Sequence, residues 1–63
     1  MNTVIRFVWE SDELCNIWQN NKHIYAANHD DHGWDGMVGI IEAFKVLAML
    51  NNWEVDIVGQ EGI

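Results

Sequence analysis

The sequence has no proline, a single cysteine and no long apolar run. The lone Cys15 excludes an internal disulfide framework and is typical of a protein in a reducing cytosol. The N-terminus lacks the basic segment and apolar stretch of a signal peptide, and no run of about 18 apolar residues is available to span a membrane. These absences predict a cytoplasmic protein with no membrane attachment.

Basic residues are equally scarce. Three Lys and Arg stand against ten Asp and Glu, which gives a formal net charge of −7 and a pI near 4.4. Direct binding to the phosphates of DNA or RNA needs a basic surface, and anionic membranes repel an acidic one. The charge therefore argues against direct nucleic-acid binding and against membrane binding.

The chain is short but apolar. It is expected to form a single domain, residues 1–63, of 7.3 kDa, and 49% of its residues are hydrophobic, including four Trp. A domain of this size buries only roughly 60% of the surface that its unfolded chain exposes. So small a core does not hide that much apolar surface, and we expect self-association or a protein partner.

Two segments alternate at period two, as strands do. In residues 3–9 one face carries Ile5, Phe7 and Trp9 and is expected on the core, and the other face, with two valines, is expected to be partly covered too. In residues 53–58 the apolar face, expected to be buried, carries Trp53, Val55 and Ile57, and the solvent-exposed face carries Glu54 and Asp56.

The segment between the first strand and residue 33 is polar and rich in asparagine. Residues 14–19 and 22–27 predict a hairpin around Asn20 and Asn21, because asparagine tolerates a positive φ. A short helix starting near Ser11 is the alternative for residues 11–20. Residues 28–33 are predicted to form a polar loop.

Residues 36–50 carry the strongest helix signal, with Asp35 as the expected N-cap and Asn51 and Asn52 as the expected stop. Apolar side chains recur there at helical spacing: Met37, Ile40, Ile41, Phe44, Leu47 and Ala48. The other faces are also apolar, because they carry Val38, Val46, Met49 and Leu50. A helix that is apolar nearly all round is covered on more than one side, which predicts a homodimer.

The order of elements defines the expected fold class. One strand, a hairpin, a helix and a last strand predict an α+β domain. We expect a small, mostly antiparallel sheet, made of a β-meander plus the C-terminal strand, packed on one long helix.

The acidic residues fall into three groups: Glu10, Asp12 and Glu13; Asp30, Asp31 and Asp35; and Glu54, Asp56 and Glu61. One interpretation is that they keep an apolar protein soluble. The more specific interpretation is that they form a surface that imitates the negative charge of DNA and occupies the basic site of a nucleic-acid-binding protein. The candidate partner-binding residues are Glu10, Asp12, Glu13, Asp30, Asp31, Trp34, Asp35, Glu54 and Asp56. Among them Trp34 is the aromatic outside the helical stripe.

Small size, strong acidity, absence of proline, abundant aromatic residues and a simple α+β order resemble the small acidic inhibitor proteins that bacteriophages encode. The resemblance lies in the general character of the whole chain and is carried by no residue motif. It implies a DNA mimic that acts in the host-cell cytoplasm on a nucleoid protein, an RNA polymerase or a CRISPR effector.

Catalytic and metal-binding chemistry find little support in the residues. His29 and His32 flank two aspartates, and His23 precedes them, but this spacing matches no standard zinc pattern. Cys15 and His23 form a conceivable pair across the hairpin, yet no third orienting group or oxyanion hole accompanies them. We therefore expect a non-enzymatic protein without metal or cofactor.

The alternative hypothesis is a homo-oligomer that sequesters a small ligand or a nucleotide. Its aromatic pocket would lie between subunits and be lined by Trp18, Tyr25, His32 and Trp34. Gly33 and Gly36 at the helix start offer backbone N–H groups to an anion, although the neighbouring aspartates repel phosphate.

Overall fold

The computed structural model describes residues 2–59, and within them four strands and one helix follow one another along the chain. They are β1 (Val4–Ser11), β2 (Leu14–Gln19), β3 (Lys22–Asn28), α1 (His29–Leu50) and β4 (Glu54–Val58). Glu61, part of the third acidic group, lies outside the described residues. The element order matches the prediction.

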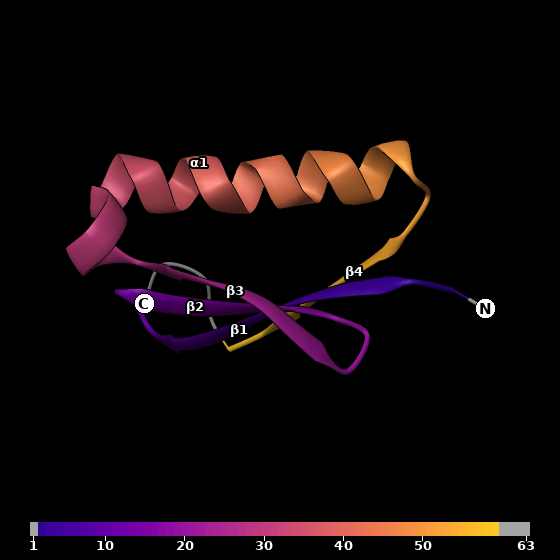
Figure 1. Ribbon diagram of the computed structural model, residues 1–63, viewed down its shortest axis with the longest axis horizontal. Helices are drawn as coiled ribbons and strands as arrows, with labels where there is room; N and C mark the ends of the chain where they lie inside the picture. Colours follow the sequence, from indigo (N-terminus) through magenta and orange to yellow (C-terminus); the bar gives the residue numbers. More distant parts are fainter. Residues whose placement is uncertain (1, 60–63) are drawn as a thin grey trace.

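The four strands form one sheet in the order β3-β2-β1-β4. The β1–β2 and β2–β3 pairs are antiparallel, whereas β4 lies parallel to β1 because α1 carries the chain back across the sheet. Figure 1 shows α1 on one face of the sheet, while no helix of residues 2–59 lies over the other face. The predicted α+β domain, with a mostly antiparallel sheet on one long helix, is confirmed.

The core lies between α1 and the face of the sheet beneath it. Alternate residues of the strands point into it, and α1 closes it with side chains at helical spacing. The buried residues are Ile5, Phe7, Cys15, Ile17, Ala27, Met37, Ile41 and Ala48. The alternation of residues 3–9 therefore predicted the buried face of β1 correctly, and Cys15 is a core residue.

Asparagines occupy the turn between β2 and β3 and the end of α1, as predicted. Asn20 has φ 56° in the β2–β3 turn, and its side-chain oxygen accepts a hydrogen bond of 3.0 Å from the Val4 amide. Asn51 caps the C-terminus of α1, and Asn52 has φ 57°. The hairpin is therefore confirmed, and the alternative helix for residues 11–20 is wrong.

The prediction of a polar loop at residues 28–33 is wrong, because α1 begins at His29. Asn28 is the N-cap: its side-chain oxygen accepts from the Asp31 amide at 2.7 Å, and its side-chain nitrogen donates to the Asp31 carboxylate at 3.0 Å. The first bond satisfies one backbone N–H of the first turn, as an N-cap does, and the second holds the Asp31 side chain against the cap. Asp35 is consequently not the N-cap, and the helix is interrupted at Gly33 instead.

The predicted buried face of β4 is only half covered. Val55 and Ile57 are 45% and 43% exposed, although they pair with the buried Ile5 and Phe7 of β1. The physical reason is width: an α-helix is about 10 Å across, which spans about two strands at a spacing of about 4.8 Å. A single helix cannot cover four strands, and the edge strand β4 is left out.

Helix α1 also presents apolar side chains away from the sheet, as its composition predicted. The exposed ones are Val38, Val46, Leu47, Met49 and Leu50.

We predict that Gly33→Ala destabilises the fold while Gly39→Ala, in the same helix, does not. Gly33 has φ 69° and ψ 174°, a conformation essentially restricted to glycine, so alanine there costs about 1–3 kcal/mol of backbone strain. A Cβ at either position meets no atom within 4 Å, so steric contact does not separate the two. Gly39→Ala gains about 0.5–1 kcal/mol of helix propensity. Urea unfolding measures both, and equal effects would contradict the strained start of α1.

Candidate functional site

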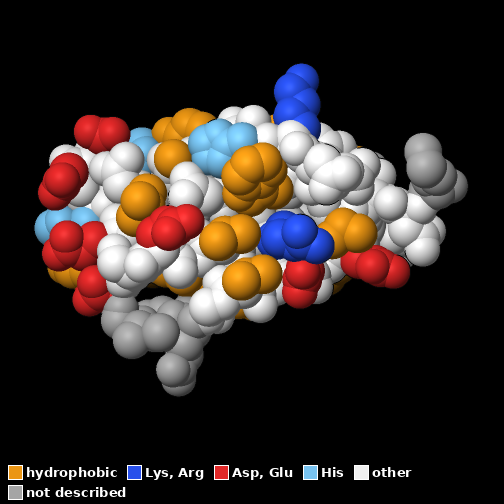
Figure 2. Space-filling model, turned by 90° about the horizontal axis from the view of Figure 1, so that it is seen from below, with side chains coloured by type: hydrophobic (Ala, Val, Ile, Leu, Met, Phe, Trp, Pro, Cys, Tyr) orange, Lys and Arg blue, Asp and Glu red, His pale blue; other side chains and the backbone are white. Residues whose placement is uncertain are grey.

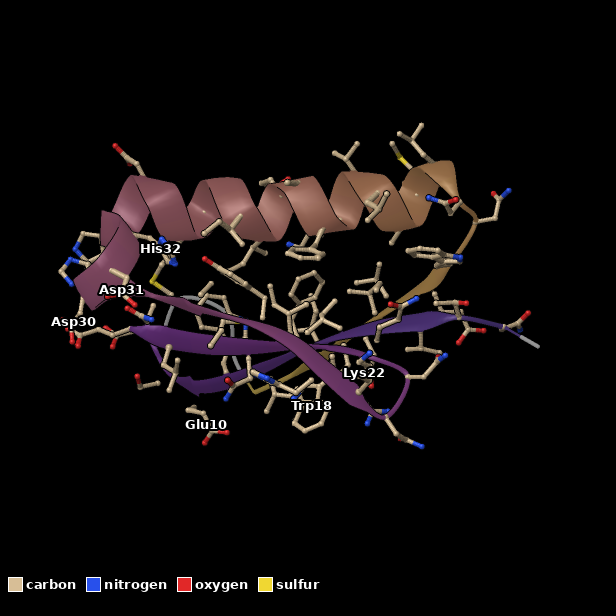
Figure 3. The ribbon with its side chains drawn as sticks, viewed as in Figure 1. Glu10, Trp18, Lys22, Asp30, Asp31 and His32 are labelled. Carbon is tan, nitrogen blue, oxygen red and sulfur yellow. The ribbon has the colours of Figure 1, made fainter. Side chains whose placement is uncertain are left out.

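Two of the three acidic groups meet at one end of the molecule. The β1–β2 turn carries Asp12 and Glu13, and the first turn of α1 carries Asp30 and Asp31. The two segments touch, because the His29 amide donates to the Glu13 carbonyl at 2.9 Å. Figure 3 shows Asp30 and Asp31 at this end, where α1 begins. We call these four residues the acidic end. Glu10 lies apart from them, on the open face of the sheet in a hollow that Arg6 also lines (Figure 3).

The acidic end carries charge of one sign only. Its four carboxylate side chains are all exposed. No lysine or arginine occurs in residues 10–21 or 23–44, so no fixed positive charge comes from the segments that build it. In the space-filling view of the open sheet face, red side chains gather toward the same end (Figure 2). The N-terminal dipole of α1 and the Asn28 amide stabilise the carboxylates of its first turn.

The third acidic group lies elsewhere. Strands β1 and β4 are neighbours, which was the condition for one continuous acidic surface. Glu54, however, pairs with Val4 at the opposite end of β1 from Glu10. The Asp56 carboxylate accepts from the Arg6 guanidinium at 3.0 Å, so its charge is balanced. The structure thus brings together two residues from each of the first two groups but leaves Glu54 and Asp56 apart from them.

A groove of about 320 Å³ adjoins the acidic end. Its apolar wall combines the end of β1 with the N-terminal half of α1, and two carboxylates complete it. The lining residues are Trp9, Asp12, Trp34, Met37, Val38, Ile41 and Glu42. We call it the tryptophan groove. Asp12 belongs to both features, so they form one surface.

Trp34 is placed in this groove by the start of α1. It follows the interruption at Gly33, its ring lies 4.1 Å from the His29 ring, and half of its side chain is exposed. The sequence pointed to Trp34 as a candidate partner-binding residue. Trp9 packs against the core from the core face of β1 and also lines the groove, near the end of the strand. Glu42 was not predicted, although it is one of two charged residues in residues 36–50, with Lys45.

The three histidines have three separate surroundings. His23 is 3.0 Å from the Asn16 side-chain oxygen, His32 is 3.0 Å from the Tyr25 hydroxyl, and His29 stacks on Trp34. In residues 2–59 no group of three His, Cys, Asp or Glu is positioned to hold a metal ion. Cys15 pairs with Ala27 in the sheet and His23 with Trp18, so the conceivable Cys15–His23 pair does not form.

The aromatic residues of the alternative pocket do not share one surface of a subunit. Tyr25 and His32 contact each other on the helix side of β3. Trp18 lies on the sheet face away from α1, where it meets His23 edge-on (Figure 3). Trp34 lines the tryptophan groove. A pocket containing all four would need residues from more than one copy of the chain.

Comparison with known proteins gives no family assignment: no family model matches the chain, and no curated protein or solved structure is significantly similar to it. Within the described residues, no helix has the length and apolar character needed to cross a membrane.

We predict that Glu13→Gln stabilises the fold at low salt and that 1 M NaCl removes the gain. Glu13 shares the acidic end with carboxylates on α1, and repulsion between neighbouring like charges costs about 0.2–0.5 kcal/mol per pair. At about 1 M salt the screening length is about 3 Å, which suppresses it. The matched control is Glu54→Gln, remote from the acidic end. Urea unfolding at two salt concentrations measures both, and an equal salt response would contradict the clustering.

Proposed function

We propose that this chain is a non-enzymatic binding protein that inhibits a nucleic-acid-binding protein by occupying its basic site with the acidic end. The observation that carries the proposal is the contact between the β1–β2 turn and the first turn of α1, distant in sequence, which brings four exposed carboxylates to one end of the molecule. Charge that serves only solubility is best interspersed over a surface. Charge collected at one end, without lysine or arginine among its segments, suits a complementary basic surface.

The electrostatics of such a site explain how it would compete with DNA. Duplex DNA presents one negative charge per about 1.7 Å of its axis, and proteins that bind it offer lysine and arginine in return. Carboxylates held in place by a folded protein can form ion pairs with the same lysine and arginine side chains. Complementary charge steers the encounter and makes association fast at low salt and slower as salt rises.

The tryptophan groove adds an apolar anchor beside this charge. Binding energy at protein interfaces concentrates in a few residues, and tryptophan is among the most frequent of them. Trp34 is half exposed and Val38 is 60% exposed, so both are accessible to an apolar side chain of a partner. A basic protein with an apolar residue among its lysines and arginines would engage both features. The nucleoid proteins, RNA polymerases and CRISPR effectors blocked by phage inhibitors are the partner classes we propose.

The second candidate is the homo-oligomeric protein that sequesters a small ligand. It is favoured by the volume of the tryptophan groove, about 320 Å³, which lies at the lower end of the usual range of roughly 300–1,000 Å³ for ligand pockets. Two tryptophan rings suit a planar molecule. Asp12 and Glu42 repel phosphate, so a neutral or cationic ligand fits this groove better than a nucleotide.

We predict that Glu13→Gln with Asp30→Asn weakens inhibition, and that Glu54→Gln with Asp56→Asn does not. Each pair removes two of the ten acidic side chains, so the two variants keep the same net charge. A basic protein captured from a bacterial lysate is loaded with labelled duplex DNA and titrated with each variant. We expect about a tenfold loss for the first pair at low salt, because both lost charges face the basic site, and little change for the second.

Equal losses in the two variants would mean that net charge, not its placement, drives the effect. Failure of the wild-type chain to displace DNA would contradict the proposed inhibition itself. A small molecule that co-purifies with the chain and is lost in Trp34→Ala would favour the second candidate.

We predict that Trp34→Ala speeds dissociation of the complex and leaves the association rate nearly unchanged. The ring contributes short-range contact, whereas long-range charge sets the encounter rate. The control is Leu50→Ala, at the other end of α1 and 73% exposed. Surface plasmon resonance separates the two rates. A slower association without a change in dissociation would show that the groove is not an anchor.

A further inference from the structure

We propose that a second copy of this chain pairs along the free edge of β4, so that two four-stranded sheets join into one. The proposal concerns the association of the protein with itself and does not depend on what the acidic end binds. It identifies the surface at which the expected homodimer forms.

The two edges of the sheet are built differently. At the β3 edge the pairing with β2 shifts register between Ile17 and Trp18, Lys22 is exposed, and the Tyr25 hydroxyl lies 3.0 Å from His32 of α1. A register shift, a lysine and a covering helix are the usual protections of an edge strand. Strand β4 pairs with β1 without a register shift and includes no lysine or proline, and in residues 2–59 no strand lies beyond it. Its two charged residues, Glu54 and Asp56, are on the open face of the sheet.

Backbone groups of β4 point to the free side. The Glu54 amide donates to the Thr3 carbonyl at 2.9 Å, which directs Glu54 toward the β1 side. Because alternate residues of a strand direct their N–H and C=O groups to opposite sides, Val55 and Ile57 direct theirs away from β1. The side chains at the same two positions are the half-exposed ones on the core face of β4. Both the backbone and the side chains there are available to another strand.

The neighbouring flank of α1 extends this apolar edge. Lys45 lies over the Phe7 ring, with its amino nitrogen 6.0 Å from the ring centroid, and Phe7 pairs with Ile57. Met49 is one turn further along the same side of α1 and is 67% exposed. We call Met49, Val55 and Ile57 the β4 strip.

Charge favours a second copy at the β4 strip. Two molecules of charge −7 repel each other most strongly at their acidic ends, which this strip avoids. Of the two carboxylates in β4, Asp56 is paired with Arg6 at 3.0 Å, and Glu54 precedes the strip on the open face of the sheet. Two copies can therefore approach here with less repulsion than at the acidic end.

The strip is also complementary to itself. An antiparallel pair of β4 strands related by a two-fold axis at Asp56 sets Val55 of one copy opposite the partner's Ile57. That register satisfies the outward N–H and C=O groups of both residues in both copies. It places the two helices on the same face, with the apolar side chains of both strips between them. The acidic ends then point in opposite directions.

Lysine scanning of adjacent positions tests the edge. Ile57→Lys places a charge in the strip and is expected to convert a dimer into a monomer. Val58→Lys is the matched control: Val58 is also exposed, at 44%, and follows Ile57 directly, but its side chain lies on the open face, opposite the partner's Glu54 in the proposed register. It is expected to leave the dimer intact or tighten it. Sedimentation equilibrium of the full chain gives the mass, and circular dichroism verifies folding.

The Arg6–Asp56 pair tests the register. The two-fold axis brings Asp56 beside the partner's Asp56, and each is balanced by its own Arg6. Arg6→Ala is therefore expected to weaken the dimer at least about tenfold at low salt, and Asp56→Asn in that background to restore it, because like charges directly opposite destabilise strand pairing. A monomeric wild type, a dimer that survives Ile57→Lys, or equal disruption by Val58→Lys would each overturn the proposal. Because the acidic end is untouched, Ile57→Lys still tests DNA competition separately.

Discussion

A single helix covering a four-stranded sheet is the constraint on which the rest of this structure depends. The helix is about 10 Å across, and strands lie about 4.8 Å apart, so it seals only part of the sheet. It begins directly after β3 and is held to that strand by Tyr25 and His32. The opposite side stays open, which leaves the tryptophan groove beside the end of β1 and the half-covered residues of β4.

The candidate site is built by local backbone geometry at the start of that helix. Asn28 caps the first turn and fixes Asp30 and Asp31 beside the β1–β2 turn. Gly33 then redirects the chain with a positive φ, which brings Trp34 over the groove. The charge and the apolar anchor are thus adjacent because one short segment positions both.

Much of the fold was predictable because its signals are local. Alternation marked β1, the Asn20–Asn21 turn marked the hairpin, and apolar spacing marked most of α1. The first turn of α1 was missed because its residues are polar and its stability comes from one cap, Asn28, rather than from apolar periodicity. The exposure of Val55 and Ile57 was missed because alternation shows which face of a strand is apolar but not whether a helix reaches it.

The site was predictable only in part, for a related reason. The acidic residues could be listed from the sequence, but the contact between Glu13 and His29 is a tertiary one that no local pattern encodes. Composition alone also does not show that Glu54 and Asp56 lie on β4, apart from the acidic end. Alternation placed Trp9 correctly on the apolar face of its strand, where it packs against the core, but did not show that it also lines the groove near the strand end.

The central claim is that the acidic end and the tryptophan groove form one binding surface. Amide chemical shifts of the isotope-labelled chain, followed by NMR while a captured basic protein is added, test it most directly. The largest changes are expected on residues 9–13 and 29–42, with little change on β3 and β4. Changes centred on β4, or spread evenly over the open face of the sheet, would contradict it.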